Sequence, residues 1–249
     1  MEMKMIVNGV KGRMGREVAK MLEERFPFAE LAAGVDIHPE GAERFPVFEK
    51  LSDYSGEADC VIDFSHYLAT EELLSFCVSR GLPVVIATTG HTEKELELIR
   101  VAAKTVPVFH SANMSLGIAL LAALAKTAAQ TMPGANIEIV EKHHNRKLDV
   151  PSGTALLIAE EIKKARPDHS LLVGRHENGR RPEKEIGIHS LRLGNIVGEH
   201  EVILATDTQV ITLKHEAQSR SLFAEGAIRA AEFLCGKEPG LYDMKDLVR

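Results

Sequence analysis

The sequence predicts an α/β fold, with a doubly wound parallel sheet domain and a smaller α+β domain that holds a mixed four-stranded sheet. Three observations support this prediction. A glycine-rich turn at 9–15 joins an apolar strand to an amphipathic helix, short apolar strands alternate with helices as far as residue 114, and three consecutive strand-like runs follow residue 185. The change of rhythm near residue 115 indicates a second domain, running roughly from Ser115 to Gln218.

The turn after the first strand indicates a nucleotide site in a Rossmann-like domain. A strand from Met3 to Val7 leads into Gly9-Val-Lys-Gly-Arg-Met-Gly15, where glycines let the backbone approach a pyrophosphate and let helix and strand pack closely. The spacing Gly-x-x-Gly-x-x-Gly departs from the commoner Gly-x-Gly-x-x-Gly. A second strand, from Glu30 to Val35, ends in Asp36, whose carboxylate can bind ribose hydroxyls. The other interpretation of Asp36 is an ordinary turn residue at a strand end.

Strands and helices continue to alternate up to residue 114. Strands are expected at 59–65, 83–87 and 106–109, and helices at 70–80 and 92–104, the second with a capping box from Thr92 to Glu95. Polar clusters follow the three strands: Asp63-Phe64-Ser65, Thr88-Thr89-Gly90 and Ser111-Ala112-Asn113. Ligands of parallel sheets bind beyond the carboxyl ends of the strands, so we expect a crevice here for ribose and nicotinamide. Turn chemistry alone would explain any one of the clusters.

The second domain is expected to contain two helices and four strands. The helices are expected at 115–131 and 154–165, and the strands at 136–141, 186–193, 196–205 and 209–215. The polar, basic segment 166–184 is expected to be a surface loop. A further amphipathic helix at 219–234 and a loosely packed tail at 239–249 follow the last strand.

The stretch between the strand 136–141 and the helix that opens near Ser152 carries the most chemistry. In this expected loop, His143, His144, Arg146 and Lys147 place four potential cations in five residues of a chain whose formal net charge is -6. Ser152 supplies an N-cap hydroxyl, and the helix start behind it offers free N–H groups that can hold carboxylates or phosphates. Histidines titrate near neutrality and can deliver a proton. The plainer interpretation is a capping serine beside a solvated basic loop.

Bulk composition argues against several kinds of partner. The chain has 249 residues, is 45% hydrophobic and mixes its charges, so we expect no nucleic-acid surface and no membrane surface. Cys60, Cys77 and Cys235 lie far apart without metal spacing, which indicates buried thiols in a reducing compartment. A secretory pattern and a run of roughly 18 apolar residues are both lacking, so a cytoplasmic protein is expected. We expect no metal, because adjacent histidines in a strand point to opposite faces.

The string His143-His144-x-x-Lys147-x-Asp149-x-Pro151-Ser152-Gly153-Thr154 resembles the signature of the 4-hydroxy-tetrahydrodipicolinate reductases, the dihydrodipicolinate reductases of lysine biosynthesis. The segments 189–200 and 214–220 resemble two further motifs of that family, so the resemblance extends over nearly the whole chain. It implies reduction of 4-hydroxy-tetrahydrodipicolinate to tetrahydrodipicolinate with NAD(P)H and loss of water. It also implies that residues 1–114 and 219–249 form the dinucleotide-binding domain, that 115–218 form a substrate-binding and oligomerisation domain, and that the protein is a homotetramer.

The resemblance also implies roles for individual residues. The cofactor would be bound by Gly9, Val10, Lys11, Gly12, Arg13 and Met14 at its phosphates, by Asp36 at the adenosine ribose, and by Ala87, Thr88, Thr89, Ser111, Ala112, Asn113 and Met114 around the nicotinamide half. His143 would be the proton donor and Lys147 a second proton donor, with His144, Gly153 and Thr154 holding the cyclic dicarboxylate substrate.

Three positions depart from the family's pattern. Ala87 stands for a glycine, Met114 for an aromatic residue, and Ile37 for the arginine that often follows the acidic residue. Either NADH or NADPH is expected as the cofactor, with NADH at least as good, because Asp36 repels a 2′-phosphate and Ile37 adds no counter-charge. Two alternatives remain at this point: another nicotinamide-dependent dehydrogenase of a small carboxylate, and a non-catalytic NAD(P)H sensor.

Overall fold

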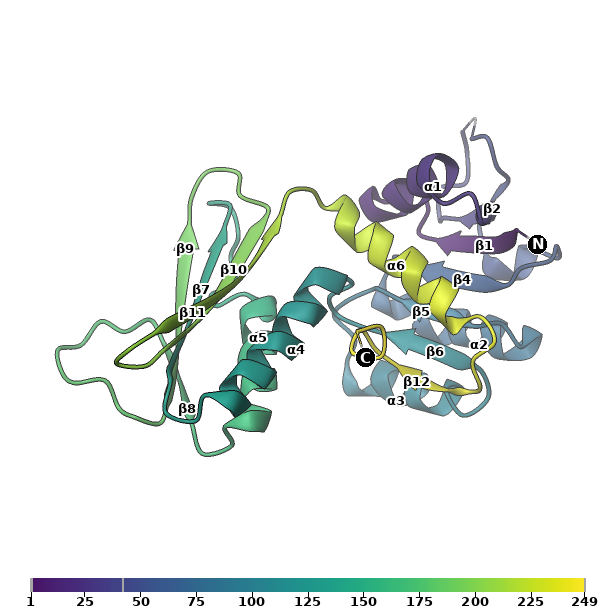
Figure 1. Ribbon diagram of the computed structural model, residues 1–249. Coiled ribbons are helices and arrows are strands. Elements are labelled where there is room, and N and C mark those ends of the chain that lie inside the picture. The colour runs from purple at the N-terminus through teal and green to yellow at the C-terminus, as the bar shows by residue number, and fades with distance from the viewer. Residues whose placement is uncertain (1, 42, 249) are drawn as a thin grey trace. The chain divides into compact units, whose positions relative to one another are not determined.

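The chain folds into two compact units. The computed structural model describes residues 2–41 and 43–248. Met1–Ser115 and Ser221–Leu247 belong to one unit, here called the N-terminal unit, and Leu116–Arg220 form the other, here called the inserted unit (Figure 1). Each unit has its own sheet and its own hydrophobic core, as expected for independent domains.

The N-terminal unit is built on a seven-stranded sheet. Its strands are β1 (Met3–Asn8), β2 (Ala29–Val35), β3 (Val47–Phe48), β4 (Cys60–Asp63), β5 (Val84–Ile86), β6 (Pro107–His110) and β12 (Gly240–Tyr242). They lie in the order β12-β6-β5-β4-β1-β2-β3, and every described pair is parallel. The predicted doubly wound, Rossmann-like sheet is confirmed. The strand order reverses between β1 and β4, where open parallel sheets bind their ligands.

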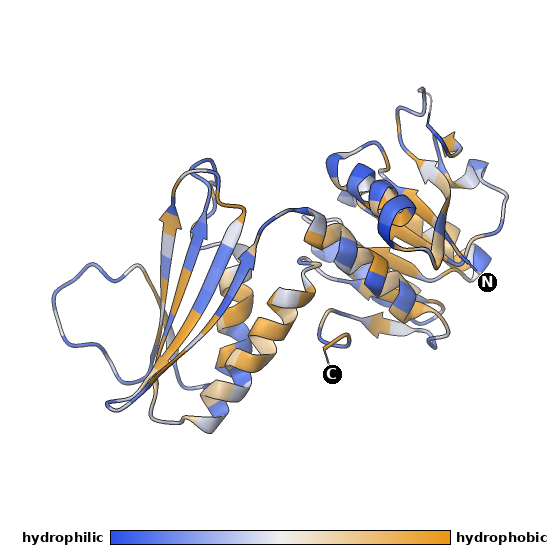
Figure 2. Cartoon of the chain, turned by 45° about the horizontal axis from the view of Figure 1, so that its top comes forward, coloured by the Kyte–Doolittle hydropathy of each residue, from blue (hydrophilic) through white to orange (hydrophobic). Residues whose placement is uncertain are grey.

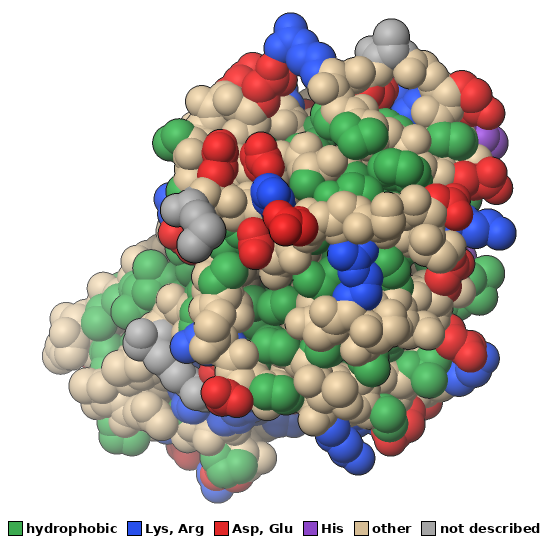
Figure 3. Space-filling model, turned by 90° about the vertical axis from the view of Figure 1, so that its right-hand side faces the viewer, with side chains coloured by type: hydrophobic (Ala, Val, Ile, Leu, Met, Phe, Trp, Pro, Cys, Tyr) green, Lys and Arg blue, Asp and Glu red, His purple; other side chains and the backbone are tan. Residues whose placement is uncertain are grey.

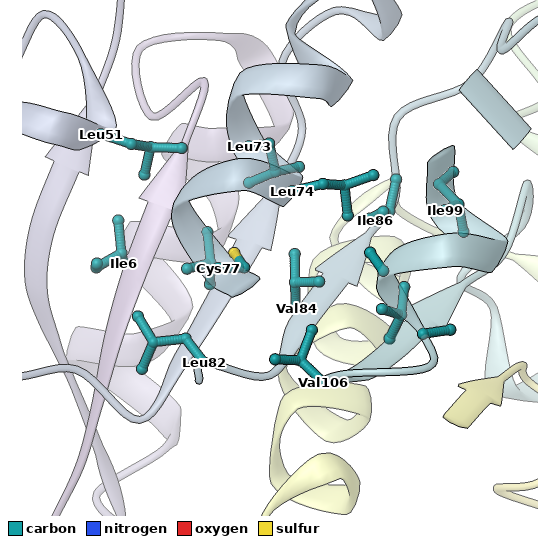
Figure 4. Packing of buried hydrophobic residues seen from close by; sticks show 14 of the residues in the cluster. Ile6, Leu51, Leu73, Leu74, Cys77, Leu82, Val84, Ile86, Ile99 and Val106 are labelled. Atoms are coloured by element: carbon teal, nitrogen blue, oxygen red, sulfur yellow. The ribbon is translucent and has the colours of Figure 1, made fainter. Parts of the chain in front are cut away.

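Helices cover both faces of this sheet. They are α1 (Arg13–Arg25), α2 (Thr70–Arg80), α3 (Glu93–Ala102) and α6 (Ser221–Leu234). The α2 and α3 helices share one face, where Leu73, Cys77 and Ile99 pack on strand residues such as Ile6 and Val84 (Figure 4). The α1 and α6 helices lie together on the opposite face. The predicted capping box is present, because the Glu95 carboxylate accepts from the Thr92 backbone N–H at 2.8 Å.

The C-terminal tail is part of the sheet, so the prediction of loose packing was wrong. Strand β12 pairs with β6 from Gly240 to Tyr242. Its Tyr242 ring lies 5.7 Å from the ring of Phe233 in α6, which in turn lies 6.3 Å from Phe109 in β6. This aromatic cluster holds a strand of only three residues, which is too short to show a periodic pattern in sequence.

The inserted unit contains a mixed sheet with two helices on one face. Its elements are α4 (Leu116–Thr131), β7 (Asn136–His143), α5 (Gly153–Ala165), β8 (Ser170–Val173), β9 (Glu185–Arg192), β10 (Gly198–Ala205) and β11 (Val210–Ala217). The strand order is β11-β10-β7-β9-β8, with β10 antiparallel to both neighbours and the other pairs parallel. The sheet is mixed as predicted, but it has five strands rather than four.

The additional strand, β8, comes from the segment predicted to be a surface loop. It is a four-residue edge strand that pairs only with β9, and its polar surroundings hide its short apolar run. The rest of the segment is anchored by Arg181. That side chain donates to the Glu138 carboxylate at 2.8 Å and to the Ile137 carbonyl at 3.1 Å.

Alternation along the strands gives this unit its core. Ile137 and Ile139 of β7, with neighbours on β9 and β10, are fully buried against α4 and α5, while the intervening residues face the other side. Figure 2 shows the alternation as orange and blue segments along the strands. No helix within residues 2–41 and 43–248 is long and apolar enough to span a bilayer. On the face that Figure 3 shows, acidic and basic side chains are interspersed among apolar ones.

Candidate active site

The turn between β1 and α1 has room only for glycine at two positions. Gly9 has φ +79°, and a Cβ there would lie 2.7 Å from the Phe64 carbonyl oxygen. A Cβ on Gly15 would lie 2.1 Å from the Gly9 carbonyl oxygen, so the first turn of α1 sits directly on the strand end. Exposed backbone therefore lies at the start of a helix, at the strand reversal point. This arrangement suits a pyrophosphate.

Asp36 lies beside this turn, at the end of β2. Its carboxylate accepts from the Lys11 backbone N–H at 3.0 Å and from the His38 backbone N–H at 3.2 Å. The Lys11 ammonium bonds the carbonyls of Pro39 and Glu40. A pocket of about 320 Å³ brings together three of the predicted residues, Gly9, Gly12 and Asp36. Val10 is different, because its side chain is buried and only its backbone could meet a ligand.

A second pocket, of about 490 Å³, lies at the carboxyl ends of β4, β5 and β6. It is lined by Arg13, Met14, Phe64, Ser65, His66, Ala87, Thr88, Thr89, Ala112, Met114 and Phe223. Seven of the predicted cofactor residues meet here. Ser111 and Asn113 form the adjoining turn, in which the Ser111 hydroxyl donates to the Asn113 carbonyl at 2.8 Å.

Sequence reasoning missed the contribution of α6 to this pocket. Phe223 lines it, and a Cβ on Gly226 would lie 1.7 Å from the Met114 carbonyl oxygen. The turn that ends in Met114 therefore rests directly on the helix. A glycine within the apolar face of a predicted helix was the available signal of such a close approach.

A buried carboxylate, Asp63, organises the strand ends behind these pockets. It is 1% exposed and accepts hydrogen bonds from the Asn8 amide at 2.8 Å, the Ser65 hydroxyl at 2.6 Å and the Thr88 hydroxyl at 2.6 Å. Burial raises the pKa of Asp63, although the hydrogen bonds from Ser65, Thr88 and Asn8 oppose that rise. The Thr88 hydroxyl is thus engaged within the protein.

In the inserted unit, the strand β7 extends to His143, two residues further than predicted. His143 therefore lies in the sheet and not in the loop, because its backbone pairs with Arg192 of β9. Residues 137, 139, 141 and 143 share the buried face of β7, so Glu141 and His143 point the same way. The His143 Nδ1 atom lies 2.5 Å from the Glu141 carboxylate.

Sequence reasoning missed Glu141, which is fully buried. Besides His143, its carboxylate accepts from the two terminal nitrogens of Arg192 at 2.7 and 2.8 Å and from the Ser152 backbone N–H at 3.1 Å. Burial pushes the pKa of Glu141 upward, but the hydrogen bonds from His143 and Arg192 outweigh it and hold this pKa well below its ordinary value. A charged residue on the apolar face of β7 was the signal in the sequence.

A second imidazole, that of His200, packs edge-on against His143 with ring centres 5.2 Å apart. Its Nε2 atom lies 3.2 Å from the Ser152 hydroxyl, which caps α5 by accepting from the Ala155 N–H at 3.1 Å as predicted. Burial first, and then the neighbouring His143, lowers the pKa of His200 to about 3. His200 is therefore neutral at physiological pH.

The loop from His144 to Ser152 supplies cationic and amide groups at the same end of the sheet. The Lys147 ammonium lies 2.9 Å from the Asp149 carboxylate and is 22% exposed. Burial of its ring lowers the pKa of His144, and the nearby charges of Arg146 and Arg220 lower it further. Gly153 opens α5 with nothing within 4 Å of where a Cβ would be, and Thr154 follows it. The Gly153 backbone hydrogen-bonds the Asp149 carboxylate, the same carboxylate that pairs with Lys147. This end of the unit can bind an anion and supply a proton.

The described part of the chain holds no cluster of side chains that could bind a metal ion. Within residues 2–41 and 43–248, no three His, Cys, Asp or Glu side chains are grouped as a metal site would require. The two histidines of the signature do not belong to such a group. His143 is buried against Glu141, and His144 belongs to the loop beyond the strand.

Known proteins resemble this chain along its whole length. Residues 3–114 match the family model described as dihydrodipicolinate reductase, N-terminus, and residues 117–248 match the one described as dihydrodipicolinate reductase, C-terminus. The 4-hydroxy-tetrahydrodipicolinate reductase of Caldanaerobacter subterraneus is 49% identical over 100% of this chain and 99% of its own. The enzyme of that name from Clostridium novyi is 43% identical over 99% and 98% of the two chains.

A solved structure agrees with the sequence matches. The dipicolinate-bound dihydrodipicolinate reductase from Paenisporosarcina sp. TG-14 is similar with a TM-score of 0.85 and 25% identity, covering 99% of this chain and 100% of that one. Both family models, both units and the full length of the relatives are therefore matched. The chain belongs to the dihydrodipicolinate reductase family, the 4-hydroxy-tetrahydrodipicolinate reductases.

Proposed function

We propose that this protein reduces 4-hydroxy-tetrahydrodipicolinate to tetrahydrodipicolinate, with NAD(P)H as reductant and loss of water, in lysine and diaminopimelate biosynthesis. Support comes from the family membership and from the relative that binds dipicolinate, a cyclic dicarboxylate. The observation that carries the proposal is the buried imidazole of His143, set beside a basic loop and a helix N-terminus. This combination suits a substrate that has two carboxylates and needs a proton.

His143 is the proton donor in this proposal. Loss of water from the substrate leaves a conjugated imine, and the reduced nicotinamide, when bound, supplies the hydride. The enamine then needs a proton on carbon. Because Nδ1 of His143 faces Glu141, the proton leaves from Nε2. His200 beside it is neutral and adds no competing positive charge.

The substrate carboxylates are held by Lys147 and by the start of α5. The Lys147 ammonium, paired with Asp149 at 2.9 Å, can exchange that partner for a substrate carboxylate. Backbone N–H groups of Gly153 and Thr154 at the positive end of the helix dipole suit the second carboxylate. His144 contacts the substrate between these two groups.

The cofactor residues lie in the N-terminal unit. The turn from Gly9 to Met14 fits the pyrophosphate, and Asp36 fits the adenosine ribose. The reason is that the backbone of this turn and the Asp36 carboxylate line the same pocket. The pocket lined by Ala87, Thr89 and Met114 fits the nicotinamide half. NADH is used at least as well as NADPH, since Asp36 repels a 2′-phosphate and Ile37 beside it is exposed without charge.

Steady-state kinetics tests these assignments. His143→Gln should lower kcat by about 10²–10⁴-fold with little change in KM, as for the loss of a general acid. Lys147→Ala should raise KM and lower kcat together, because Lys147 both binds a substrate carboxylate and aids protonation as the second proton donor. The exposed residues His176 and Lys164 provide matched controls, and His176→Gln and Lys164→Ala should behave like wild type.

Two results would contradict the proposal. Near-normal kcat in His143→Gln would remove His143 as the acid. In the same assays, a KM for NADPH more than about tenfold below that for NADH, roughly 1.4 kcal/mol, would refute the assignment of Asp36.

We also propose a homotetramer assembled through the inserted unit. The face of its sheet opposite α4 and α5 carries no helix of that unit, yet it holds ordered ion pairs such as Lys142–Glu199 at 3.0 Å and Lys214–Glu199 at 3.1 Å. Val210 on the same sheet is 63% exposed. A sheet face of mixed charges and apolar residues suits pairing with copies of itself. Sedimentation of the purified protein should give four chains per particle, and a monomer would contradict this. A cytoplasmic location also remains a prediction, supported by three free cysteines. Cys60 and Cys77 are buried as predicted, but the prediction was wrong for Cys235, which is exposed near the end of α6.

A further inference from the structure

A buried carboxylate, Glu141, lies directly behind His143. We propose that Glu141 is a positioning residue: it fixes His143 in the tautomer with hydrogen on Nδ1, which leaves Nε2 to exchange the proton, while Arg192 keeps the carboxylate ionised throughout. This inference rests on the proposed role of His143 as the acid, and it goes beyond that role by naming what orients the ring.

The hydrogen-bond set around Glu141 determines which atom carries the hydrogen. Its four hydrogen bonds come from Nδ1 of His143, from both terminal nitrogens of Arg192 and from the backbone N–H of Ser152. Arginine and a backbone amide can only donate. Of these groups, only Nδ1 of His143 could accept a hydrogen from a protonated carboxyl. The permanent charge of Arg192 on both carboxyl oxygens favours the ionised form instead, so the carboxylate accepts from Nδ1–H of His143.

Arg192 separates the carboxylate from the proton that His143 gives away. Its planar fork meets both oxygens of Glu141 at 2.7 and 2.8 Å, and its charge is permanent. When His143 loses its Nε2 proton, the imidazole becomes neutral but the carboxylate still has a cation. Without Arg192, the carboxylate and the imidazole would compete for one proton in a buried place.

The ring of His143 is confined on its other sides as well. A Cβ on Gly198 would lie 3.1 Å from Nε2, so the backbone of β10 leaves space for the ring and little more. The edge of His200 packs against it at 5.2 Å between ring centres. With Nδ1 bound by Glu141, rotation of the ring is blocked and Nε2 keeps one direction.

A purely structural role is the competing explanation, because Glu141 also holds the loop before α5. It accepts from the Ser152 N–H, and Arg192 donates to the Asp149 carbonyl at 2.8 Å. A matched control exists on the same strand. Glu138 also pairs with an arginine and a histidine, Arg181 at 2.8 Å and His189 at 2.9 Å, but it faces away from the signature loop.

The test combines kinetics, ligand binding and NMR of the histidine ring nitrogens in the full-length protein. Glu141→Gln keeps the shape of the side chain but removes its charge. It should lower kcat by about 10–100-fold, by analogy with the loss of a carboxylate that orients a metal-bound histidine. The dissociation constant for dipicolinate should stay within about threefold of wild type, because a loss of about tenfold would mark displacement of the binding loop. Glu138→Gln should leave kcat unchanged.

The wild-type protein supplies a readout that does not depend on a stable Glu141 variant. In the neutral state, the His143 signal, identified by its absence in His143→Gln, should show hydrogen on Nδ1 and a bare Nε2. Hydrogen on Nε2 would overturn the inference, as would a Glu141→Gln enzyme with unchanged kcat, or one whose kcat loss is matched by an equal loss of dipicolinate binding. If His143→Gln were fully active, the proposed function would fail while the tautomer measurement still decided the role of Glu141.

Discussion

The two units each hold one buried carboxylate at the carboxyl end of a strand, and these two carboxylates behave in opposite ways. Asp63 in the N-terminal unit is 1% exposed and Glu141 in the inserted unit is fully buried. Each accepts four hydrogen bonds. Yet the pKa of Asp63 is raised and that of Glu141 is lowered, with burial as the first cause at both sites and opposed by hydrogen bonds at both.

The difference lies in the charge of the donors rather than in their number. Asp63 is bound by an amide, two hydroxyls and a backbone N–H, all of them neutral. Neutral donors offset only part of the cost of burying a charge. Glu141 is bound by His143 and by Arg192, whose charge is permanent, so hydrogen bonds that include a cation more than compensate for burial. One site can therefore organise strand ends, while the other provides a permanent charge behind a proton donor.

The largest expected effect comes from removing the permanent cation. Arg192→Met should lower the free energy of unfolding by about 3–5 kcal/mol, because it leaves Glu141 buried without a counter-charge. Urea denaturation at neutral pH measures this loss. Arg181→Met is the matched control and should lose clearly less, since its partner Glu138 is 26% exposed and keeps water as a partner. Equal losses of stability in Arg192→Met and Arg181→Met would show that burial of the partner carboxylate does not decide the size of the loss.

A smaller effect is expected at the neutral site. Thr88→Val keeps the shape of the side chain but removes the 2.6 Å hydrogen bond to Asp63. The free energy of unfolding should fall by about 1–3 kcal/mol, the cost of leaving a buried polar atom short of a partner. Thermal unfolding measures this loss. Thr208→Val is the control, because Thr208 is exposed, and its stability should stay within about 0.5 kcal/mol of wild type. A loss no larger than that of the control would mean that Thr88 does not stabilise Asp63.

The smallest effect is the most diagnostic, because its sign should differ between the sites. The raised pKa of Asp63 means that its charge destabilises the fold as pH rises above the ordinary value of 3.8. Asp63→Asn should therefore be less damaging at pH 7 than at pH 4. The lowered pKa of Glu141 means that its stabilisation is present above the ordinary value of 4.5 and is lost as pH falls.

Glu141→Gln should accordingly be more damaging at pH 7 than at pH 4. Urea denaturation of both variants and of wild type at the two pH values gives the result. The penalty changes by at most about 1.4 kcal/mol for each pH unit over which the folded and unfolded states differ by one bound proton. If the stability losses of Asp63→Asn and Glu141→Gln changed with pH in the same direction, the charge of the hydrogen-bond donors would not be the cause of the opposite pKa shifts.

Features set by neighbouring residues could be predicted from sequence, and features set by strand register could not. The glycine turn, the Ser152 cap and the capping box at Thr92 are local, so their residues are recognisable by spacing. Arg192 meets Glu141 only because β9 pairs with β7 in a register that sets Arg192 opposite His143. Fifty-one positions separate this arginine from its carboxylate, and no sequence spacing marks that distance.

The short strands escaped prediction for a related reason. β8 and β12 have four and three residues, no more than two full repeats of a strand pattern. Each is held by its neighbour in the sheet and, for β12, by the aromatic contact of Tyr242 with Phe233. The long strands β7 and β10 alternate over eight residues each, and β11 alternates from Thr212 onward. All three were predicted within a few residues of their observed ends.

The division of the N-terminal unit into two stretches of chain has a consequence for its synthesis. The inserted unit is one uninterrupted stretch, Leu116–Arg220, and can complete its fold as it leaves the ribosome. The sheet of the N-terminal unit is made first but finished last, since α6 and β12 are translated after the inserted unit. Until then the edge of β6 is unpaired and the apolar face under α6 is bare. A chain truncated at Arg220 would have a complete inserted unit attached to a sheet that lacks strand β12 and the cover of helix α6. This is the species that chaperones would meet.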